Sequence, residues 1–96
     1  MNHLDLLKSK RNEILSIAQK HGATNLKIFG SVARGEESPD SDIDFLVETL
    51  PKCSPFFPAG LTIELEDMLG CKVDIVIKEA LHYYIRESVL KEAIPL

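Results

Sequence analysis

The chain has 96 residues, of which 45% are hydrophobic and 27% charged, a composition that fits an ordinary globular domain and excludes a disordered or fibrous protein. Its eleven Lys and Arg residues are scattered and the formal net charge is −4, so we expect no nucleic-acid partner, because a phosphate backbone is bound by a basic surface. No segment approaches the about 20 apolar residues that cross a bilayer, so we expect no membrane partner and a cytoplasmic location. The length predicts a single domain over residues 1–96, with Cys53 and Cys71 as free thiols.

Apolar residues recur with helical spacing in three segments of the chain. The expected helices are residues 4–20, 61–69 and 79–93, and a short further helix is expected to begin at Val32. Asn2 is the expected N-cap of the first helix, and Gly22 and Gly70 follow the first two as natural stops. Pro95 is expected to end the last helix.

Three short segments rich in β-branched residues lie between these helices and predict strands. The expected strands are residues 26–29, 43–48 and 72–77. The resulting order, αβαβαβα, predicts an α/β (α+β) fold in which a small mixed sheet is flanked by helices.

The last helix carries more apolar surface than one buried stripe requires. The side expected to face the core carries Leu81, Ile85 and Val89, while Tyr83, Tyr84 and Leu90 widen the apolar surface beyond it. The loop of residues 51–60 adds Phe56 and Phe57, which either plug the core or form a docking patch. We therefore expect a protein partner or a homo-oligomer.

The most informative stretch is IFGSVARGEESPDSDIDFLV, residues 28–47. Gly30 and Ser31 form a tight turn after a strand, where backbone N–H groups and the Ser31 hydroxyl can point to one place. A helix that begins beside this turn adds the positive end of its dipole, and Arg34 adds a positive charge. We interpret Gly30, Ser31 and Arg34 as residues that bind the triphosphate of a nucleotide.

Three aspartates follow on two expected strands. Ten residues, 32–41, separate the turn from Asp42 and Asp44, which share one strand face because side chains alternate with period two. Asp74 repeats this arrangement within KVDIVI, where an unpaired acid among apolar residues costs free energy unless it binds a metal. Mg²⁺ prefers oxygen ligands and shares them with substrate phosphates. We therefore expect Asp42, Asp44 and Asp74 to be catalytic residues and ligands of two Mg²⁺ ions.

The pattern Gly-Ser, ten residues, Asp-x-Asp resembles the signature of the polymerase-beta-like nucleotidyltransferases. Its fuller form, GSVARG at residues 30–35 and SDIDF at residues 41–45, resembles the minimal nucleotidyltransferase (MNT) branch, as do VDIV around Asp74 and the closing EALHYYIRESVLKEAIPL. The resemblance implies that Asp42 and Asp44 bind both metals and that Asp74 binds the catalytic metal and helps to activate the acceptor hydroxyl. It also implies that the Gly-Ser turn holds the β and γ phosphates.

The same resemblance implies Mg²⁺-dependent transfer of a nucleoside monophosphate, AMP from ATP, onto a protein hydroxyl. Some MNT proteins act as antitoxins that transfer AMP to a tyrosine of a HEPN-type ribonuclease toxin, which would then be both substrate and partner. About twenty residues follow Asp74, so we expect another polypeptide or a second copy to complete the acceptor pocket. Two alternatives stay open: a non-catalytic antitoxin that neutralises its partner by binding, and a nucleotidyltransferase that acts on small molecules such as antibiotics.

Overall fold

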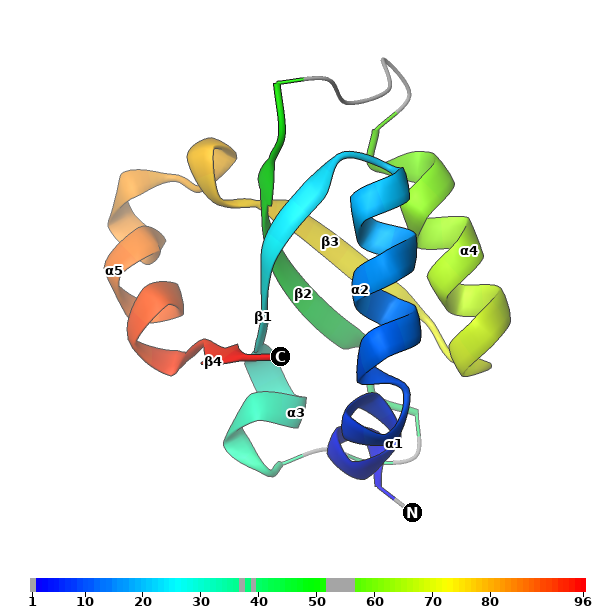
Figure 1. The fold of residues 1–96 in the computed structure, drawn as a ribbon. Coiled ribbons are helices and arrows are strands. Elements are labelled where there is room, and N and C mark those ends of the chain that lie inside the picture. Colours follow the sequence, from blue (N-terminus) through cyan, green and yellow to red (C-terminus); the bar gives the residue numbers. More distant parts are fainter. Residues whose placement is uncertain (1, 37, 39, 52–56) are drawn as a thin grey trace.

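The computed structural model describes residues 2–36, 38, 40–51 and 57–96. The elements, in chain order, are α1 (His3–Ser9), α2 (Arg11–Lys20), β1 (Ala23–Phe29), α3 (Gly30–Arg34), β2 (Ile43–Thr49), α4 (Ala59–Leu69), β3 (Val73–Ile77), the 3-10 helix η1 (Lys78–Ala80), α5 (Tyr83–Glu92) and β4 (Ile94–Pro95) (Figure 1). Helices and strands alternate as the sequence predicts, and the expected fold class, a small mixed sheet flanked by helices, is confirmed.

The sheet has four strands in the order β3-β2-β1-β4. Strands β2 and β3 are parallel, and β1 is antiparallel to both β2 and β4. Helix α4 makes the crossover that two sequential parallel strands require. Helices α2 and α4 lie side by side on one side of the sheet, whereas α5 lies on the other side (Figure 1). One sheet face is therefore covered by two packed helices, and the other is left more open.

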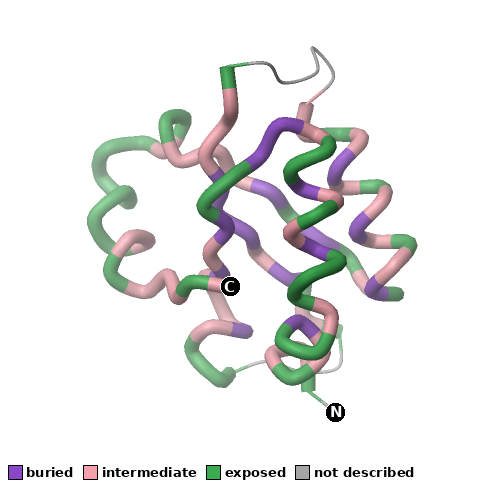
Figure 2. The backbone as a smooth tube through the Cα atoms, viewed as in Figure 1, coloured by how far each residue is buried: buried purple, intermediate pink, exposed green. Residues whose placement is uncertain are grey.

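The core lies between the sheet and the pair α2 and α4, as the distribution of buried residues in Figure 2 shows. Leu7, Ile14, Leu61 and Leu65 are completely buried on the helices, and Ile43, Phe45 and Val47 are completely buried on β2. These three β2 residues share one face of the strand, because side chains alternate along it. The opposite face of the same strand carries Asp44 and Glu48, which are partly buried, and Leu46, which is buried.

The N-terminal helix differs from the prediction. Instead of one helix over residues 4–20, the chain forms α1 and α2 with a change of direction at Lys10, whose φ and ψ are −108° and 17°. The sequence did not indicate this bend, because neither glycine nor proline lies at this position. The helical hydrogen bonding of α1 continues up to it, since the Lys10 N–H still donates to the Leu6 carbonyl. The expected N-cap is confirmed, because the Asn2 side chain accepts the Asp5 N–H at 2.8 Å.

The C-terminal region also differs from the prediction. The expected helix over residues 79–93 is divided into η1 and α5, because His82 is extended and its ring nitrogen accepts the Tyr84 N–H as an N-cap. The helix ends before Pro95, which lies in β4, a fourth strand that pairs with β1. Nor does Ile85 face the core, since 52% of its surface is exposed and α5 buries no residue.

The loop before α4 is described only in part. Phe57 is partly buried and packs against the core, which favours the interpretation as a core plug for this residue. Phe56 and Cys53 lie outside the described residues, and Cys71 is a free thiol, as expected.

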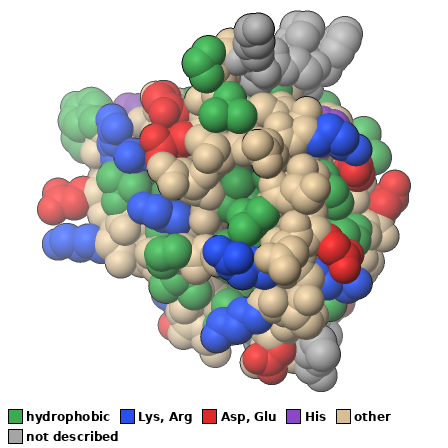
Figure 3. Space-filling view, viewed as in Figure 1, with side chains coloured by type: hydrophobic (Ala, Val, Ile, Leu, Met, Phe, Trp, Pro, Cys, Tyr) green, Lys and Arg blue, Asp and Glu red, His purple; other side chains and the backbone are tan. Residues whose placement is uncertain are grey.

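Within the described part of the chain, no helix is long and apolar enough to span a bilayer. On the face seen in Figure 3, Lys and Arg side chains lie among acidic, polar and apolar ones.

Candidate active site

The Gly30 turn joins the end of β1 directly to α3. The helix begins at Gly30 and not at Val32 as predicted, and Gly30 has a φ of 75°, which a residue with a Cβ rarely adopts. A Cβ at this position would lie 2.1 Å from Oδ2 of Asp44. Glycine is therefore required both by the conformation of the turn and by its closeness to the acidic strand.

The predicted acids come from two adjacent strands. Asp44 on β2 pairs in parallel register with Asp74 on β3 and in antiparallel register with Phe29 at the end of β1. Asp42 lies just before β2, on the same side of the alternation as Asp44. The sheet thus places the turn, Asp44 and Asp74 in successive neighbouring positions across three strands.

The three acids differ in their exposure. Asp44 is partly buried, whereas Asp42 and Asp74 are exposed. The prediction that Asp74 stands in a buried strand interior was therefore wrong, because the face of β3 that carries it is open to solvent. Burial of a carboxylate costs free energy unless it is paired or binds a cation, and among the three acids this cost falls on Asp44.

The electrostatics of Asp44 show that the acids act on one another. Burial is the largest cause that raises the pKa of Asp44 from 3.8 to about 6, and the negative charges of Asp74 and Asp42 raise it further. Smaller contributions come from Glu92, which raises this pKa, and from Arg34, which lowers it. A cation bound between the acids would relieve this repulsion.

The donors of the site suit a hard cation. Asp42, Asp44 and Asp74 offer carboxylate oxygens, which are the ligands that Mg²⁺ prefers, and Mg²⁺ commonly takes the rest of its shell from water and substrate phosphates. Among the described residues, no three His, Cys, Asp or Glu side chains form a ready cage for a metal ion.

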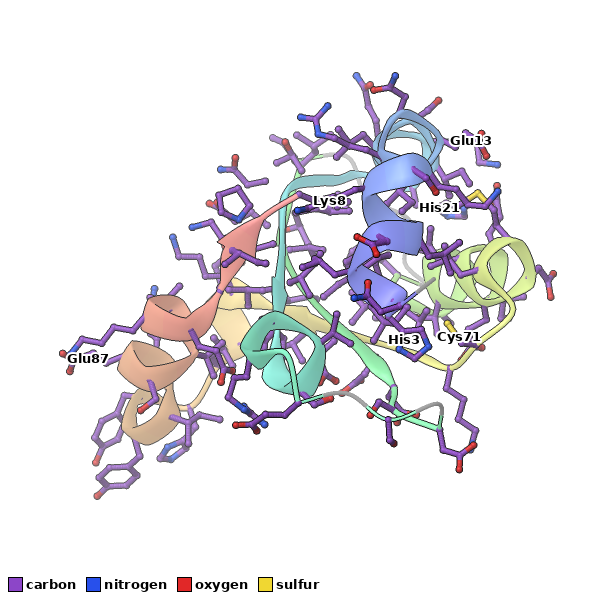
Figure 4. All side chains as sticks on the ribbon, turned by 90° about the horizontal axis from the view of Figure 1, so that it is seen from below. His3, Lys8, Glu13, His21, Cys71 and Glu87 are labelled. Carbon is purple, nitrogen blue, oxygen red and sulfur yellow. The ribbon has the colours of Figure 1, made fainter. Side chains whose placement is uncertain are left out.

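A hollow adjoins Asp42, where the chain approaches the starts of β2 and β3. Its volume is about 350 Å³, and it is lined by Asp40, Ser41, Asp42, Gly70, Cys71 and Lys72. Cys71 lies in the connection between α4 and β3 (Figure 4), and burial raises the pKa of its thiol. The hollow gives a substrate room beside Asp42, and Lys72 supplies a positive charge there.

Arg34 lies at the last turn of α3, where its guanidinium is already paired. Its Nε donates to Glu36 at 2.9 Å and its Nη1 donates to Glu92 at 2.5 Å. These carboxylates raise the pKa of Arg34, so it stays a cation. Arg34 thus lies four residues after Gly30, on the short helix that begins at the turn.

Glu92 is the residue at this site that the sequence pattern did not indicate. It lies in the last turn of α5, and its Oε2 accepts the Gly30 N–H at 2.8 Å while its Oε1 accepts from Arg34. Both contacts lower the pKa of Glu92. Because Glu92 lies 62 positions after Gly30, only the fold brings them together, and no local spacing could have shown the contact.

Comparison with known proteins shows the family of this chain. The nucleotidyltransferase domain family matches residues 10–96. The protein adenylyltransferase MntA of Thermococcus cleftensis is 38% identical over 80 residues, which cover 81% of this chain and 79% of that protein. A candidate protein adenylyltransferase of Methanocaldococcus jannaschii, MJ0435, is 38% identical over 84 residues, which cover 88% of this chain and 90% of that protein. The chain belongs to the nucleotidyltransferase domain family.

Solved structures place the chain more narrowly. A candidate minimal nucleotidyltransferase is 44% identical, with 100% of both chains covered and a TM-score of 0.86. Two toxin–antitoxin complexes share the fold at low identity. One was solved with AMP-PNP (TM-score 0.74, 21% identity, 88% of this chain and 69% of that chain covered). The other holds a tri-AMPylated HEPN toxin of Shewanella oneidensis and an MNT antitoxin (TM-score 0.68, 18% identity, 92% and 69% covered). The resemblance to the MNT branch is thereby confirmed.

Proposed function

We propose that this nucleotidyltransferase moves AMP from ATP onto a hydroxyl group of a HEPN-type ribonuclease toxin and thereby acts as an antitoxin. The observation that carries the proposal is the position of the Gly30 turn directly against Asp44, with Asp74 next in register. A phosphate-binding turn and an acidic strand are thus adjacent, as nucleotidyl transfer requires. Relatives named protein adenylyltransferases, and the fold shared with MNT antitoxins bound to HEPN toxins, support the choice of acceptor.

The turn and α3 hold the triphosphate in this proposal. The Ser31 amide and hydroxyl, at the positive end of α3, donate to the β and γ phosphate oxygens. Arg34 has five N–H donors and uses two of them on Glu36 and Glu92. Its remaining donors and its charge favour a phosphate nearby. AMP-PNP in a complex of the same fold supports an adenine nucleotide as the substrate.

The acids then act on the α phosphate and on the acceptor. Mg²⁺ held by Asp42, Asp44 and Asp74, with two ions as the expected number, would neutralise charge on the phosphates and on the attacking oxygen. Asp74 would orient the acceptor hydroxyl and accept its proton as the oxygen attacks. The hydroxyl oxygen forms a bond to the α phosphorus, the bond to the β-phosphate oxygen breaks, and pyrophosphate leaves. The product is a phosphodiester between AMP and the acceptor side chain.

The acceptor comes from outside this chain. The face of the sheet that carries Asp74 is open, so a hydroxyl on a second protein can reach it. The cytoplasmic location expected from the sequence is consistent with ATP as donor and stays a prediction.

Mass spectrometry tests the proposal directly. The protein is incubated with ATP, Mg²⁺ and its HEPN-type toxin, and the toxin is measured before and after. We expect the toxin to gain AMP on a hydroxyl side chain with the wild type, and to gain none with Asp44→Asn. If the toxin lost its ribonuclease activity without gaining mass, the protein would neutralise by binding alone. A transfer to small-molecule hydroxyls with an unmodified toxin would support the metabolite-modifying alternative.

A further inference from the structure

We propose that Glu92 is a positioning residue that clamps the Gly30 turn in the shape that receives the phosphates of the nucleotide. The proposal rests on the proposed function for the role of that turn. The geometry that supports it involves one carboxylate, one backbone N–H and one guanidinium, contributed by two helices that are far apart in sequence.

The first reason is that α3 has no cap of its own. Its N-cap residue is Phe29, which has no side-chain acceptor, and the structure records no side-chain cap bond from it. The first N–H groups of any helix have no partner within the helix. Glu92 provides the missing acceptor to Gly30 at 2.8 Å, so the carboxylate of α5 caps α3 from a distance.

The second reason is that Glu92 holds both ends of the same helix. One oxygen accepts from Gly30 at the first residue of α3, and the other accepts from Arg34 at its last residue. A helix of five residues is too short to be stable by its own hydrogen bonds. Two bonds to one carboxylate therefore fix where α3 lies and how the turn is oriented.

The third reason is that Glu92 is itself held firmly. Two residues after Glu92 the chain enters β4, where Ile94 pairs with Ile28, two residues before Gly30. Glu92 and the turn are thus anchored to the same strand, β1. The Ser31 amide and hydroxyl, which we assign to the phosphates, belong to the next residue, so Glu92 holds the turn without taking them.

A comparison of two glutamates on α5 tests this role. Glu92→Ala removes both contacts, whereas Glu92→Gln keeps an acceptor for the Gly30 N–H and loses the charge that holds Arg34. Glu87→Ala is the matched control, because Glu87 lies on the outer side of α5 (Figure 4) and its side chain is 85% exposed beside Lys91. Circular dichroism and thermal unfolding first confirm that each variant is folded at the assay temperature.

Amide hydrogen exchange by NMR gives the first readout, without nucleotide. In Glu92→Ala we expect the Gly30 amide to exchange at least about tenfold faster, because a hydrogen bond to a charged group is lost. Glu87→Ala should leave this rate unchanged and Glu92→Gln should lie between. An unchanged Gly30 rate in Glu92→Ala would show that no clamp exists.

Calorimetric titration with Mg²⁺ and ATP gives the second readout. We expect Kd to rise about tenfold in Glu92→Ala and by less in Glu92→Gln, since a misplaced turn loses part of its phosphate contacts. Tighter ATP binding by Glu92→Ala would overturn the proposal and identify Glu92 as an anion that competes with phosphate. If the wild type bound no ATP, the proposed function would fail, while exchange at Gly30 would still decide whether Glu92 clamps the turn.

Discussion

At the residue scale, Asp44 is the centre of the site: it touches the Gly30 turn on one side and is next to Asp74 on the other. Burial, and then the negative charges of Asp74 and Asp42, raise its pKa to about 6, so its own negative charge is costly when no cation is present. The alternation of strand residues predicted which acids share this face. It could not predict that Asp44 is partly buried and Asp74 exposed, because that depends on which elements cover the sheet.

Removing any one of the three acids should abolish most transfer. We expect Asp42→Asn, Asp44→Asn and Asp74→Asn each to lower kcat at least about 100-fold with Mg²⁺, because the charge that develops at the phosphorus is no longer neutralised in place. Steady-state transfer from labelled ATP measures this effect. Asp67→Asn, an exposed acid on α4 outside the candidate site, is the control and should stay near the wild type. Near-normal kcat in one of the three variants would remove that residue from the site.

Asp44→Asn should also stabilise the metal-free protein in a pH-dependent way. Since the pKa of Asp44 is raised from 3.8 to about 6 in the folded state, the unfolded chain releases this proton more readily, and stability is lost as pH rises through this window. Asn removes that cost. Allowing for solvent screening, we expect a gain of about 1 kcal/mol at pH 7.5 and almost none at pH 4.

Thermal unfolding in EDTA at the two pH values measures the difference between Asp44→Asn and the wild type. Asp67→Asn, an exposed acid on α4, controls for general effects of charge. A gain that is equal at both pH values, or a clear loss at pH 7.5, would contradict the assigned cause of the shift.

At the scale of elements, the short helix α3 depends on contacts that the sequence shows only in part. The Gly-Ser pattern predicted the turn, because glycine suits the conformation and a following helix suits an anion. The clamp by Glu92 and the pairing of β4 with β1 were not predictable, because both join residues more than sixty positions apart. The sequence predicts that Pro95 ends a helix, whereas it lies in the edge strand β4. Proline is also common in edge strands, because a residue there can lack an N–H donor.

Gly30→Ala tests whether the close packing of Gly30 against Asp44 of β2 is required for stability and for ATP binding. A Cβ at 2.1 Å from Oδ2 of Asp44 forces the turn and the acid apart, and the positive φ adds about 1 kcal/mol of strain. We expect an unfolding free energy lowered by about 2 kcal/mol or more and a loss of measurable ATP binding. Chemical denaturation and calorimetry measure the two effects.

Gly35→Ala is the matched control, because Gly35 also has a positive φ of 73° but a Cβ there would meet nothing within 4 Å. It should cost only about 1 kcal/mol and leave ATP binding intact. Equal effects of the two substitutions would mean that the contact with Asp44 has no role of its own.

At the scale of the whole molecule, α5 exposes large apolar side chains that a partner protein could bind. His82, Tyr83 and Tyr84 form a stacked aromatic group, with the Tyr83 and Tyr84 ring centroids 4.1 Å apart. Tyr83 and Tyr84 are 68% and 75% exposed, which confirms the expectation that this helix carries uncovered apolar surface. Phe57, for which the sequence left a core plug and a docking patch open, packs against the core.

Replacing Tyr83 and Tyr84 together by Ala should weaken binding to the HEPN-type toxin at least about tenfold, since exposed aromatic residues commonly dominate an interface. Surface plasmon resonance measures this binding, and calorimetry checks that the affinity for Mg²⁺ and ATP is unchanged. Ile63→Ala is the control, because Ile63 is 60% exposed on α4, across the sheet from α5. Normal toxin binding by the Tyr83 and Tyr84 double variant would place the partner on another face.

The reaction itself is tested most directly by following which phosphorus of ATP reaches the toxin. Two parallel reactions use ATP labelled at the α or at the γ phosphate, with Mg²⁺, the wild-type protein and the HEPN-type toxin, and with Asp44→Asn as the blank. Because we expect attack at the α phosphorus with loss of pyrophosphate, the α label should appear on the toxin and the γ label should not. Transfer of the γ label, or of neither label while ATP is bound, would contradict nucleotidyl transfer at this site.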